Sequence, residues 1–246
     1  MKLIINNWLK NNQLLNFSSL VNTLFKQKCL LCDINTDALQ TNIHAACRAC
    51  LNDLPWHPNT SCPQCGLSSS GQLCGSCIGS PPDFDVTISV FLYDFPINSM
   101  MQRYKYGEML SLCAFFGQML SEKVTIDFVD LIIPMPMHPA RIKERSFNQA
   151  LEIAKVLCKN HKEKLDYKSA ARQKLTPPQA SLPLKERVKN IKGAFKVNGD
   201  LVGKRIAIVD DVMTTGASLN ELAKTLKKSG ASHVECWIIA RTLPPK

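Results

Sequence analysis

Aromatic side chains are scarce in this sequence, which has three Trp and four Tyr among its 246 residues. Proteins that hold single-stranded nucleic acid commonly stack its bases on such side chains, so the sequence does not indicate base-specific recognition of a single strand. Long apolar runs are also missing, since none reaches the roughly 18–20 residues that a membrane-spanning helix requires. We therefore expect no transmembrane segment.

Positive charge is sparse in the first part of the chain and abundant in the rest. Residues 1–102 contain five Lys and Arg against six Asp and Glu, whereas residues 103–246 contain 25 against 14. The net charges of the two parts, −1 and +11, add up to the +10 of the whole chain. A basic second part suits an anionic partner, either a phosphorylated small molecule or nucleic acid. A solvated basic surface with no such partner is the alternative.

The first 28 residues contain apolar side chains that polar residues interrupt, and no small-residue cleavage site follows them. A secretory signal peptide is therefore not expected. We interpret the segment as a helix that packs against the rest of the protein, with a membrane-surface helix as the alternative. Together with cysteines that suit metal binding rather than disulfides, this predicts a cytoplasmic protein.

Cysteine is abundant, and eight of the 11 cysteines fall into four Cys-x-x-Cys pairs. Each pair places two thiolates on one tight turn, and two such turns supply the tetrahedral Cys₄ site that Zn²⁺ prefers. Four pairs therefore predict two structural zinc sites in a segment too short to have a large core without metal. In the simplest, sequential pairing, the ligands are Cys29, Cys32, Cys47 and Cys50 for one ion and Cys62, Cys65, Cys74 and Cys77 for the other.

Other arrangements of these cysteines stay open at this point. A crossed pairing of the four turns is one, and replacement of a cysteine ligand by His44 or His57 is another. An iron–sulfur cluster and redox-active dithiols are the competing chemistries. Gly66, directly after Cys65, is a residue type that lets such a turn close. The remaining cysteines stand in apolar contexts and are predicted to be buried free thiols: Cys113, Cys158 and Cys236.

The segment 206–218 gives the clearest indication of a ligand. An apolar run predicts a buried strand that ends in two adjacent carboxylates, Asp210 and Asp211, and a helix is predicted over 219–229. The hydroxyl-rich loop between them lies at the carboxyl end of a strand and the amino end of a helix, where backbone N–H groups can hold a phosphate. Taken alone, the acidic pair is more often a surface cap and the loop a plain turn. Their joint order predicts a ribose-phosphate site.

Strands and helices alternate along the second part of the chain. Strands are predicted at 86–93, 130–135, 205–209 and 233–240, which favours an α/β fold with a mainly parallel sheet and helices on both faces. A basic segment, 141–149, is expected to lead into a helix, and 172–179 is expected to be a loop. A linker is predicted at 80–83, where the cysteine pattern ends. The predicted organisation is a helical segment at 1–28, a double zinc ribbon at 29–79 and the α/β domain at 84–243.

The 206–218 segment resembles the phosphoribosyl pyrophosphate (PRPP) motif of type I phosphoribosyltransferases. Five further motifs occur in order: Pro136-Met-His138, Arg145-x-Phe-Asn-Gln-Ala150, Thr176-x-x-Gln179, Arg187-x-x-Asn190 and Gly193-Ala-Phe195. With the Cys-x-x-Cys turns, the chain resembles the ComF/GntX family over roughly residues 24–243. It departs from that family at Ser146, where Gly is common, at Ala217, where Thr or Ser is frequent, and in 97–105, which is only loosely similar.

The resemblance implies a type I phosphoribosyltransferase-like domain preceded by a small Cys-rich double zinc ribbon. It assigns Asp210 and Asp211 to the ribose hydroxyls of PRPP, or of a ligand like ribose 5-phosphate, bound with Mg²⁺. Its 5′-phosphate is assigned to Thr214, Thr215, Gly216, Ala217 and Ser218. Pyrophosphate needs N–H groups and cations, and the candidates are Met137, His138, Arg141 and Arg145, with Lys105 closing over the same phosphates. The candidate catalytic residues are Asp210, Asp211, Arg145 and Lys105.

Three functions are compatible with these features. The first is a competence protein that binds PRPP and assists the handling of single-stranded DNA during natural transformation, with a competence helicase as a candidate partner; this follows from the resemblance. The second is an active phosphoribosyltransferase for an unknown nitrogenous acceptor. The third is a regulatory module that senses PRPP or a nucleotide. The first is the function we expect.

Overall fold

The computed structural model describes residues 27–36, 46–105, 111–175 and 190–244, which belong to two compact units, Met1–Asp53 and Leu54–Lys246. The predicted helical segment 1–28 therefore lies almost wholly outside the described residues. In the smaller unit, two short strands pair antiparallel and a helix follows them. These elements are β1 (Gln27–Lys28), β2 (Asn35–Thr36) and α3 (Arg48–Asn52).

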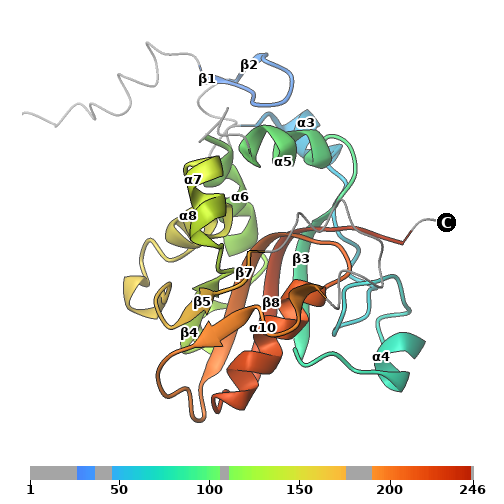
Figure 1. Cartoon of the computed structure of the whole chain (residues 1–246). Helices are drawn as coiled ribbons and strands as arrows, with labels where there is room; N and C mark the ends of the chain where they lie inside the picture. Colours follow the sequence, from blue (N-terminus) through green and yellow to red (C-terminus); the bar gives the residue numbers. More distant parts are fainter. Residues whose placement is uncertain (1–26, 37–45, 106–110, 176–189, 245–246) are drawn as a thin grey trace, which may run out of the picture. The chain divides into compact units, whose positions relative to one another are not determined.

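A parallel sheet of four strands lies at the centre of the larger unit (Figure 1). Its strand order is β3-β8-β7-β4, and every neighbouring pair runs parallel. This confirms the predicted α/β fold. The bounds of the strands are β3 (Val86–Leu92), β4 (Leu131–Pro134), β7 (Arg205–Met213) and β8 (His233–Arg241).

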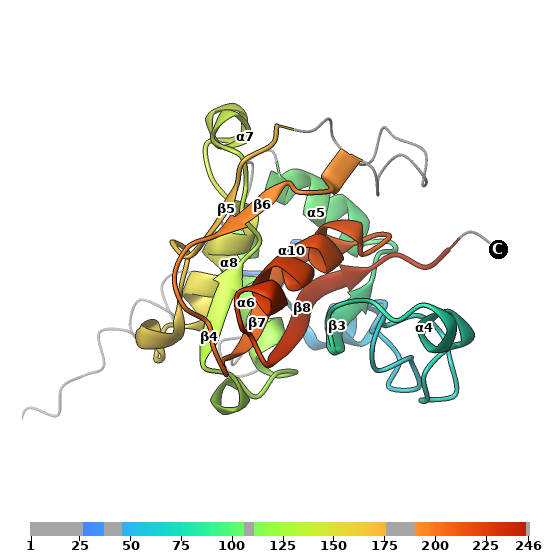
Figure 2. The same cartoon turned by 60° about the horizontal axis from the view of Figure 1, so that its bottom comes forward.

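Helices cover both faces of this sheet (Figure 2). Successive side chains of a strand point to opposite faces, so Ile206 and Ile208 of β7 share one face. They pack in one core cluster with Leu222 and Leu226 of α10 (Ala217–Lys228). On the other face, α6 (Ser111–Ser121) and α8 (Gln149–Leu157) pack against each other and against the strands.

The remaining elements surround the sheet. An antiparallel pair, β5 (Ala170–Arg172) with β6 (Phe195–Val197), adds to the core that α10 covers. Further helices in the described part of the chain include α4 (Gly75–Gly79), α5 (Ile97–Lys105) and α7 (Pro139–Arg145), with single 3₁₀ turns at Ile126–Phe128 and Lys162–Lys164. No helix within the described ranges combines the length and the hydrophobicity that crossing a bilayer requires.

The outer strand β3 is partly covered by the chain segment Pro55–His57. The main chain of Trp56 forms an antiparallel bridge with Phe91, and Leu92 N donates to Pro55 O at 2.7 Å. His57 N donates to Val90 O at 3.0 Å. The chain just after the smaller unit thus adds a short stretch of backbone pairing to the edge of the sheet.

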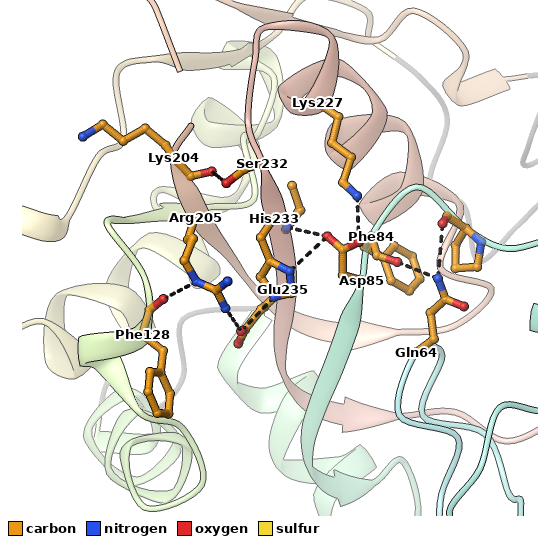
Figure 3. Close-up of polar contacts among 12 residues, drawn as sticks. Gln64, Phe84, Asp85, Phe128, Lys204, Arg205, Lys227, Ser232, His233 and Glu235 are labelled. Carbon is orange, nitrogen blue, oxygen red and sulfur yellow. Dashed lines mark hydrogen bonds and ion pairs between the residues drawn. The ribbon is translucent and has the colours of Figure 1, made fainter. Parts of the chain in front are cut away.

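Charged side chains join the strands where they begin (Figure 3). Asp85, just before β3, accepts hydrogen bonds from Val234 N at 2.8 Å and from Lys227 Nζ at 2.7 Å. At the start of β7, the Arg205 side chain donates to Phe128 O at 2.7 Å. These bonds fix the amino-terminal edge of the sheet and leave the opposite edge to the loops that follow the strands.

Two elements differ from the sequence prediction. β7 does not end at Val209 but continues to Met213, because β8 provides partners as far as Arg241. The basic segment after β4 is not merely a lead into the next helix: it forms a helix of its own, α7, with Pro139 in its first turn. Proline suits that position, where its missing N–H has no intrahelical partner.

Gly117 allows α6 and α8 to approach closely, because a Cβ at this position would lie 2.6 Å from both Val156 Cβ and Val156 Cγ1. We expect Gly117→Ala to lower the free energy of unfolding by about 1–3 kcal/mol through overpacking, despite the better helix propensity of Ala. Urea denaturation would measure this loss. Val156→Ala should recover part of it in the double variant, and additive effects would contradict the contact.

Candidate functional site

A cavity of about 360 Å³ lies at the carboxyl-terminal edge of the sheet, in the larger unit. Parallel pairing matches Pro134 of β4 with Val209 of β7, so both strands deliver their following residues to the same edge. This is where open α/β sheets place ligands. Predicted site residues that line the cavity are Lys105, Met137, His138, Arg141, Arg145, Asp210, Asp211, Thr214 and Ser218.

The acidic pair is half-buried and is partly neutralised by Lys105. Lys105 Nζ lies 3.0 Å from Asp211 Oδ2, and the nearby Asp211 carboxylate raises the pKa of the lysine. Lys105 comes from the end of α5, so it approaches the carboxylates from a different element. Its predicted role in closing over the phosphates stays a prediction, since here it contacts the acidic pair.

Burial and the adjacent Asp211 charge raise the pKa of Asp210 from its ordinary value of 3.8 to about 8. A hydrogen bond from Asp211 N to Asp210 Oδ1, 2.9 Å long, opposes this shift, and so does the charge of Lys105. Two carboxylates so close together resist simultaneous ionisation. A group that donates hydrogen bonds or carries positive charge would therefore be favoured at this pair.

The loop between β7 and α10 has the form expected for an anion site. Gly216 adopts φ 77°, a left-handed conformation, and directly precedes the first turn of α10. Its conformation favours glycine, whereas the atom that a Cβ would approach, Met213 Cε at 2.7 Å, ends a flexible side chain. Thr215 Oγ1 accepts a hydrogen bond from Ala217 N at 3.2 Å. The phosphate-binding roles of Thr214, Thr215, Gly216, Ala217 and Ser218 stay predictions.

The opposite wall comes from the end of β4 and from α7. His138 caps α7, with Nδ1 accepting from Ala140 N at 3.2 Å, and Arg141 forms an ion pair with Glu144 at 2.6 Å. Ser146 ends α7 with φ 69°. This left-handed conformation explains why the related family commonly has Gly at this position.

Four of the cavity-lining residues outside the predicted set have polar side chains: Tyr93, Asn148, Gln149 and Arg172. Asn148 caps α8 through Oδ1 and donates from Nδ2 to Met135 O at 3.1 Å, so it ties the helix to the end of β4. The buried Gln149 donates to Lys105 O at 3.3 Å. Asn148 and Gln149 belong to the motif Arg145-x-Phe-Asn-Gln-Ala150, and this motif is the sequence feature that could have indicated them as site residues. Arg172 was assigned to a loop, but it ends β5 and pairs with Phe195.

The cysteines assemble in the sequential pairing, with one cluster in each compact unit. Within each cluster the four Sγ atoms lie within 4.8 Å of one another. A tetrahedron with Zn–S bonds of 2.3 Å has edges of about 3.8 Å. The structure has Cys32 Sγ 3.8 Å from Cys47 Sγ and Cys65 Sγ 3.6 Å from Cys74 Sγ. Both clusters therefore have the dimensions of a zinc site.

Main-chain N–H groups favour thiolates in both clusters. Cys47 N donates to Cys29 Sγ at 3.2 Å, and Cys74 N donates to Cys62 Sγ at 3.4 Å. Burial alone would raise the pKa values of Cys29 and Cys62. Main-chain hydrogen bonds of this kind outweigh burial and lower both pKa values to about 6. His57 bonds instead to Gly66 O at 2.8 Å, and His44 lies outside the described residues.

Comparison with known proteins agrees with this architecture. Residues 142–243 match the phosphoribosyl transferase domain family. The DNA utilization protein YhgH of Escherichia coli (strain CFT073) is 30% identical over 193 residues, which cover 75% of this chain and 85% of that protein. The chain belongs to the ComF family. Competence protein F of Haemophilus influenzae is 28% identical over 88% of this ComF-family chain and 98% of its own length. Competence protein ComFC of Streptococcus pneumoniae is 23% identical over 87% of this chain and 100% of its own length.

The raised pKa of Asp210 predicts a stability cost of the site. Between about pH 4 and pH 8 the unfolded chain loses a proton that the folded chain keeps, so stability should fall as the pH rises through this window. Asp210→Asn removes this term. We expect it to increase the free energy of unfolding by about 1–3 kcal/mol at pH 8, and by much less at pH 4.

Urea denaturation at several pH values would measure this difference. Asp127→Asn is the matched control, because its side chain is 84% exposed, lies before β4 away from the acidic pair, and should change stability little at any of these pH values. An Asp210→Asn variant whose stability relative to the wild type does not change with pH would contradict the assignment.

The two cysteine clusters predict two equivalents of zinc for each chain. The double substitution Cys62→Ser/Cys65→Ser should lower the metal content to about one equivalent and the melting temperature with it, because two of four ligands are lost. Metal analysis by atomic emission would measure this. Cys113→Ser, which changes a buried thiol outside both clusters, should keep two equivalents. Iron in place of zinc would favour the iron–sulfur alternative.

Proposed function

We propose that this chain binds PRPP, or a related ribose phosphate, together with Mg²⁺ in the cavity at the carboxyl edge of the sheet. We further propose that this binding serves the handling of single-stranded DNA during natural transformation. The supporting observation is that one cavity gathers the acidic pair and the adjoining loop before α10 with the basic helix α7, which lies more than 60 residues earlier in the sequence.

Each part of a ribose phosphate finds a suitable group there. Ribose hydroxyls donate hydrogen bonds, which the carboxylates of Asp210 and Asp211 can accept. The N–H groups of the Thr214–Ser218 loop and the positive end of the α10 dipole favour the 5′-phosphate. Arg141 and Arg145 add positive charge at the opposite wall, as a pyrophosphate group requires.

The donor set also fits Mg²⁺, which prefers oxygen ligands and is usually held by one or two carboxylates with substrate phosphates. Asp210 and Asp211 would supply those carboxylates. Bound there, the ion would neutralise phosphate charge. The chain's own contribution is to orient the ribose through the acidic pair, with Lys105 fixing Asp211 at 3.0 Å.

The role in DNA handling draws on the relatives and on charge. The names of three relatives refer to DNA utilization or to competence. The net charge of +11 over residues 103–246 suits a polyanion, since phosphate contacts dominate nucleic-acid affinity.

A second candidate function is phosphoribosyl transfer to a nitrogenous acceptor. It is favoured by the match of residues 142–243 to the phosphoribosyl transferase domain family. Breaking the bond between ribose C1 and pyrophosphate builds positive charge on the sugar and negative charge on the leaving group. Cations held in place beforehand would stabilise the negative charge on the leaving pyrophosphate, which is the role predicted for Arg145.

Isothermal titration of PRPP with Mg²⁺ tests the ribose-phosphate site. We expect saturable binding by the wild type and at least a tenfold loss in the Asp210→Asn/Asp211→Asn double variant. Asp127→Asn is the control, because its carboxylate is exposed near the amino-terminal edge of the sheet and should not affect binding.

Two further readouts separate the functions. Release of pyrophosphate in the presence of candidate acceptors would indicate transfer rather than binding alone. Affinity for single-stranded DNA should fall linearly with salt on a log–log scale if phosphates are contacted. A folded, zinc-loaded wild type that fails to bind PRPP would contradict the proposed ribose-phosphate site.

A further inference from the structure

Arg241, the last residue of β8, is buried and connects three segments of the chain; its relative exposure is 2%. Its guanidinium donates from Nε to Cys65 O at 2.9 Å and from Nη1 to Met213 O at 2.9 Å. Nη1 also donates to Thr214 O and to Thr242 O. Its acceptors here are main-chain carbonyl groups, so the side chain fixes backbone positions rather than another side chain.

One of these segments is a turn of the second cysteine cluster. Cys65 belongs to that cluster, and a Cβ on the next residue, Gly66, would lie 3.6 Å from Arg241 Cδ. The same turn is held against β3, because Thr87 donates from Oγ1 to Gln64 O at 2.6 Å and from N to Pro63 O at 2.9 Å. The guanidinium therefore lies against a turn whose position is fixed by the sheet.

Another segment is the beginning of the loop that precedes α10. Met213 ends β7 and Thr214 begins the loop, and Arg241 binds the carbonyl groups of both. Thr242 N donates to Met213 O at 3.0 Å as well. The direction of the backbone as it enters the loop thus depends on the same guanidinium that contacts the cysteine turn.

Charge supports the same connection. A buried cation is costly unless opposite charge or hydrogen bonds compensate it. Four thiolates around Zn²⁺ carry a net charge of −2, and Cys65 and Cys77 are among the groups that favour the charged form of Arg241 against its burial. A zinc-loaded cluster therefore supplies negative charge next to this arginine.

We propose that Arg241 is a positioning residue that couples the second cysteine cluster to the phosphate-binding loop. With zinc bound by Cys62, Cys65, Cys74 and Cys77, the guanidinium holds Met213 and Thr214 so that the N–H groups of the following loop converge on a phosphate. Loss of the zinc releases the loop and weakens ligand binding. The ligand in this statement rests on the proposed function, but the connection between turn and loop does not.

Coupling between two sites is reciprocal: if zinc strengthens phosphate binding, the phosphate ligand strengthens zinc retention by the same factor. Such couplings are typically about 5–150-fold. Arginine is needed because its fork of donors reaches two segments at once, whereas lysine has a single ammonium group. Arg241→Lys thus keeps the charge and loses part of the connection, and Arg241→Met loses both.

Arg205 provides a matched control. It lies at the opposite edge of the same sheet, where it donates to Phe128 O and pairs with Glu235 at 3.8 Å (Figure 3). Its side chain is 47% exposed. Arg205→Met therefore removes the same charge from the same sheet without touching the cysteine turn or the loop.

Hydrogen exchange tests the connection without any ligand. In zinc-loaded protein, we expect the amides of Thr214–Ser218 to exchange about tenfold faster in Arg241→Met than in the wild type, with a smaller increase in Arg241→Lys. Arg205→Met should leave them unchanged. Unchanged exchange in both Arg241 variants, with zinc content measured as full, would overturn the proposal.

Zinc affinity tests the reciprocal effect and needs only the wild type, so it stays informative if the Arg241 variants fail to fold. PRPP with Mg²⁺ should raise the affinity for one of the two zinc equivalents by about tenfold, measured by equilibrium competition with a chromogenic chelator. In Arg241→Lys this increase should shrink, and PRPP affinity should fall while zinc content stays full.

The outcomes separate the two proposals. Faster loop exchange in the Arg241 variants without PRPP binding to the wild type would sustain the positioning role and contradict the ribose-phosphate site. PRPP binding that leaves the zinc affinity of the wild type unchanged, or that is equally tight in Arg241→Lys, would overturn the coupling and leave the ribose-phosphate site standing.

Discussion

The parallel pairing of β7 with β4 and β8 is the constraint on which the rest of the larger unit depends. It matches Pro134 with Val209 and Asp210 with Ile238, so the residues after β4 and the acidic pair of β7 meet at one edge. The same pairing buries alternate side chains under helices on both faces. Fold and site are therefore two results of one register, and a shift of β7 would displace both.

The site conflicts with the stability of the fold that contains it. Two adjacent carboxylates stand in the half-buried last part of β7, and only one of them, Asp211, pairs closely with Lys105. The raised pKa of Asp210 reflects the cost of this arrangement. Such a cost is understandable if a ligand with hydroxyl groups and a cation relieves it, since binding to the folded state alone also stabilises that state.

The sequence predicts local features of this molecule well and remote ones poorly. The strand, acidic pair, loop and helix over 205–228 are contiguous, and each Cys-x-x-Cys turn is complete within four residues, so pattern alone identified them. The extension of β7 to Met213 depends on β8, and the place of Arg172 depends on β6, which follows more than 20 residues later. The sequence around Arg241 does not indicate its role, because its hydrogen-bond partners lie up to 176 residues away.

The short pairing of Pro55–His57 with β3 also bears on how the sheet is protected. An exposed edge strand offers free N–H and C=O groups to other chains, which makes it a template for aggregation. Here Leu92 N and Val90 O are occupied by the segment that precedes the second cysteine cluster. A fragment that began at residue 84 would carry the whole parallel sheet but leave this edge bare. The segment Pro55–His57 in the cysteine-rich region thus also protects β3 from edge-to-edge association with other chains, independently of any bound metal or ligand.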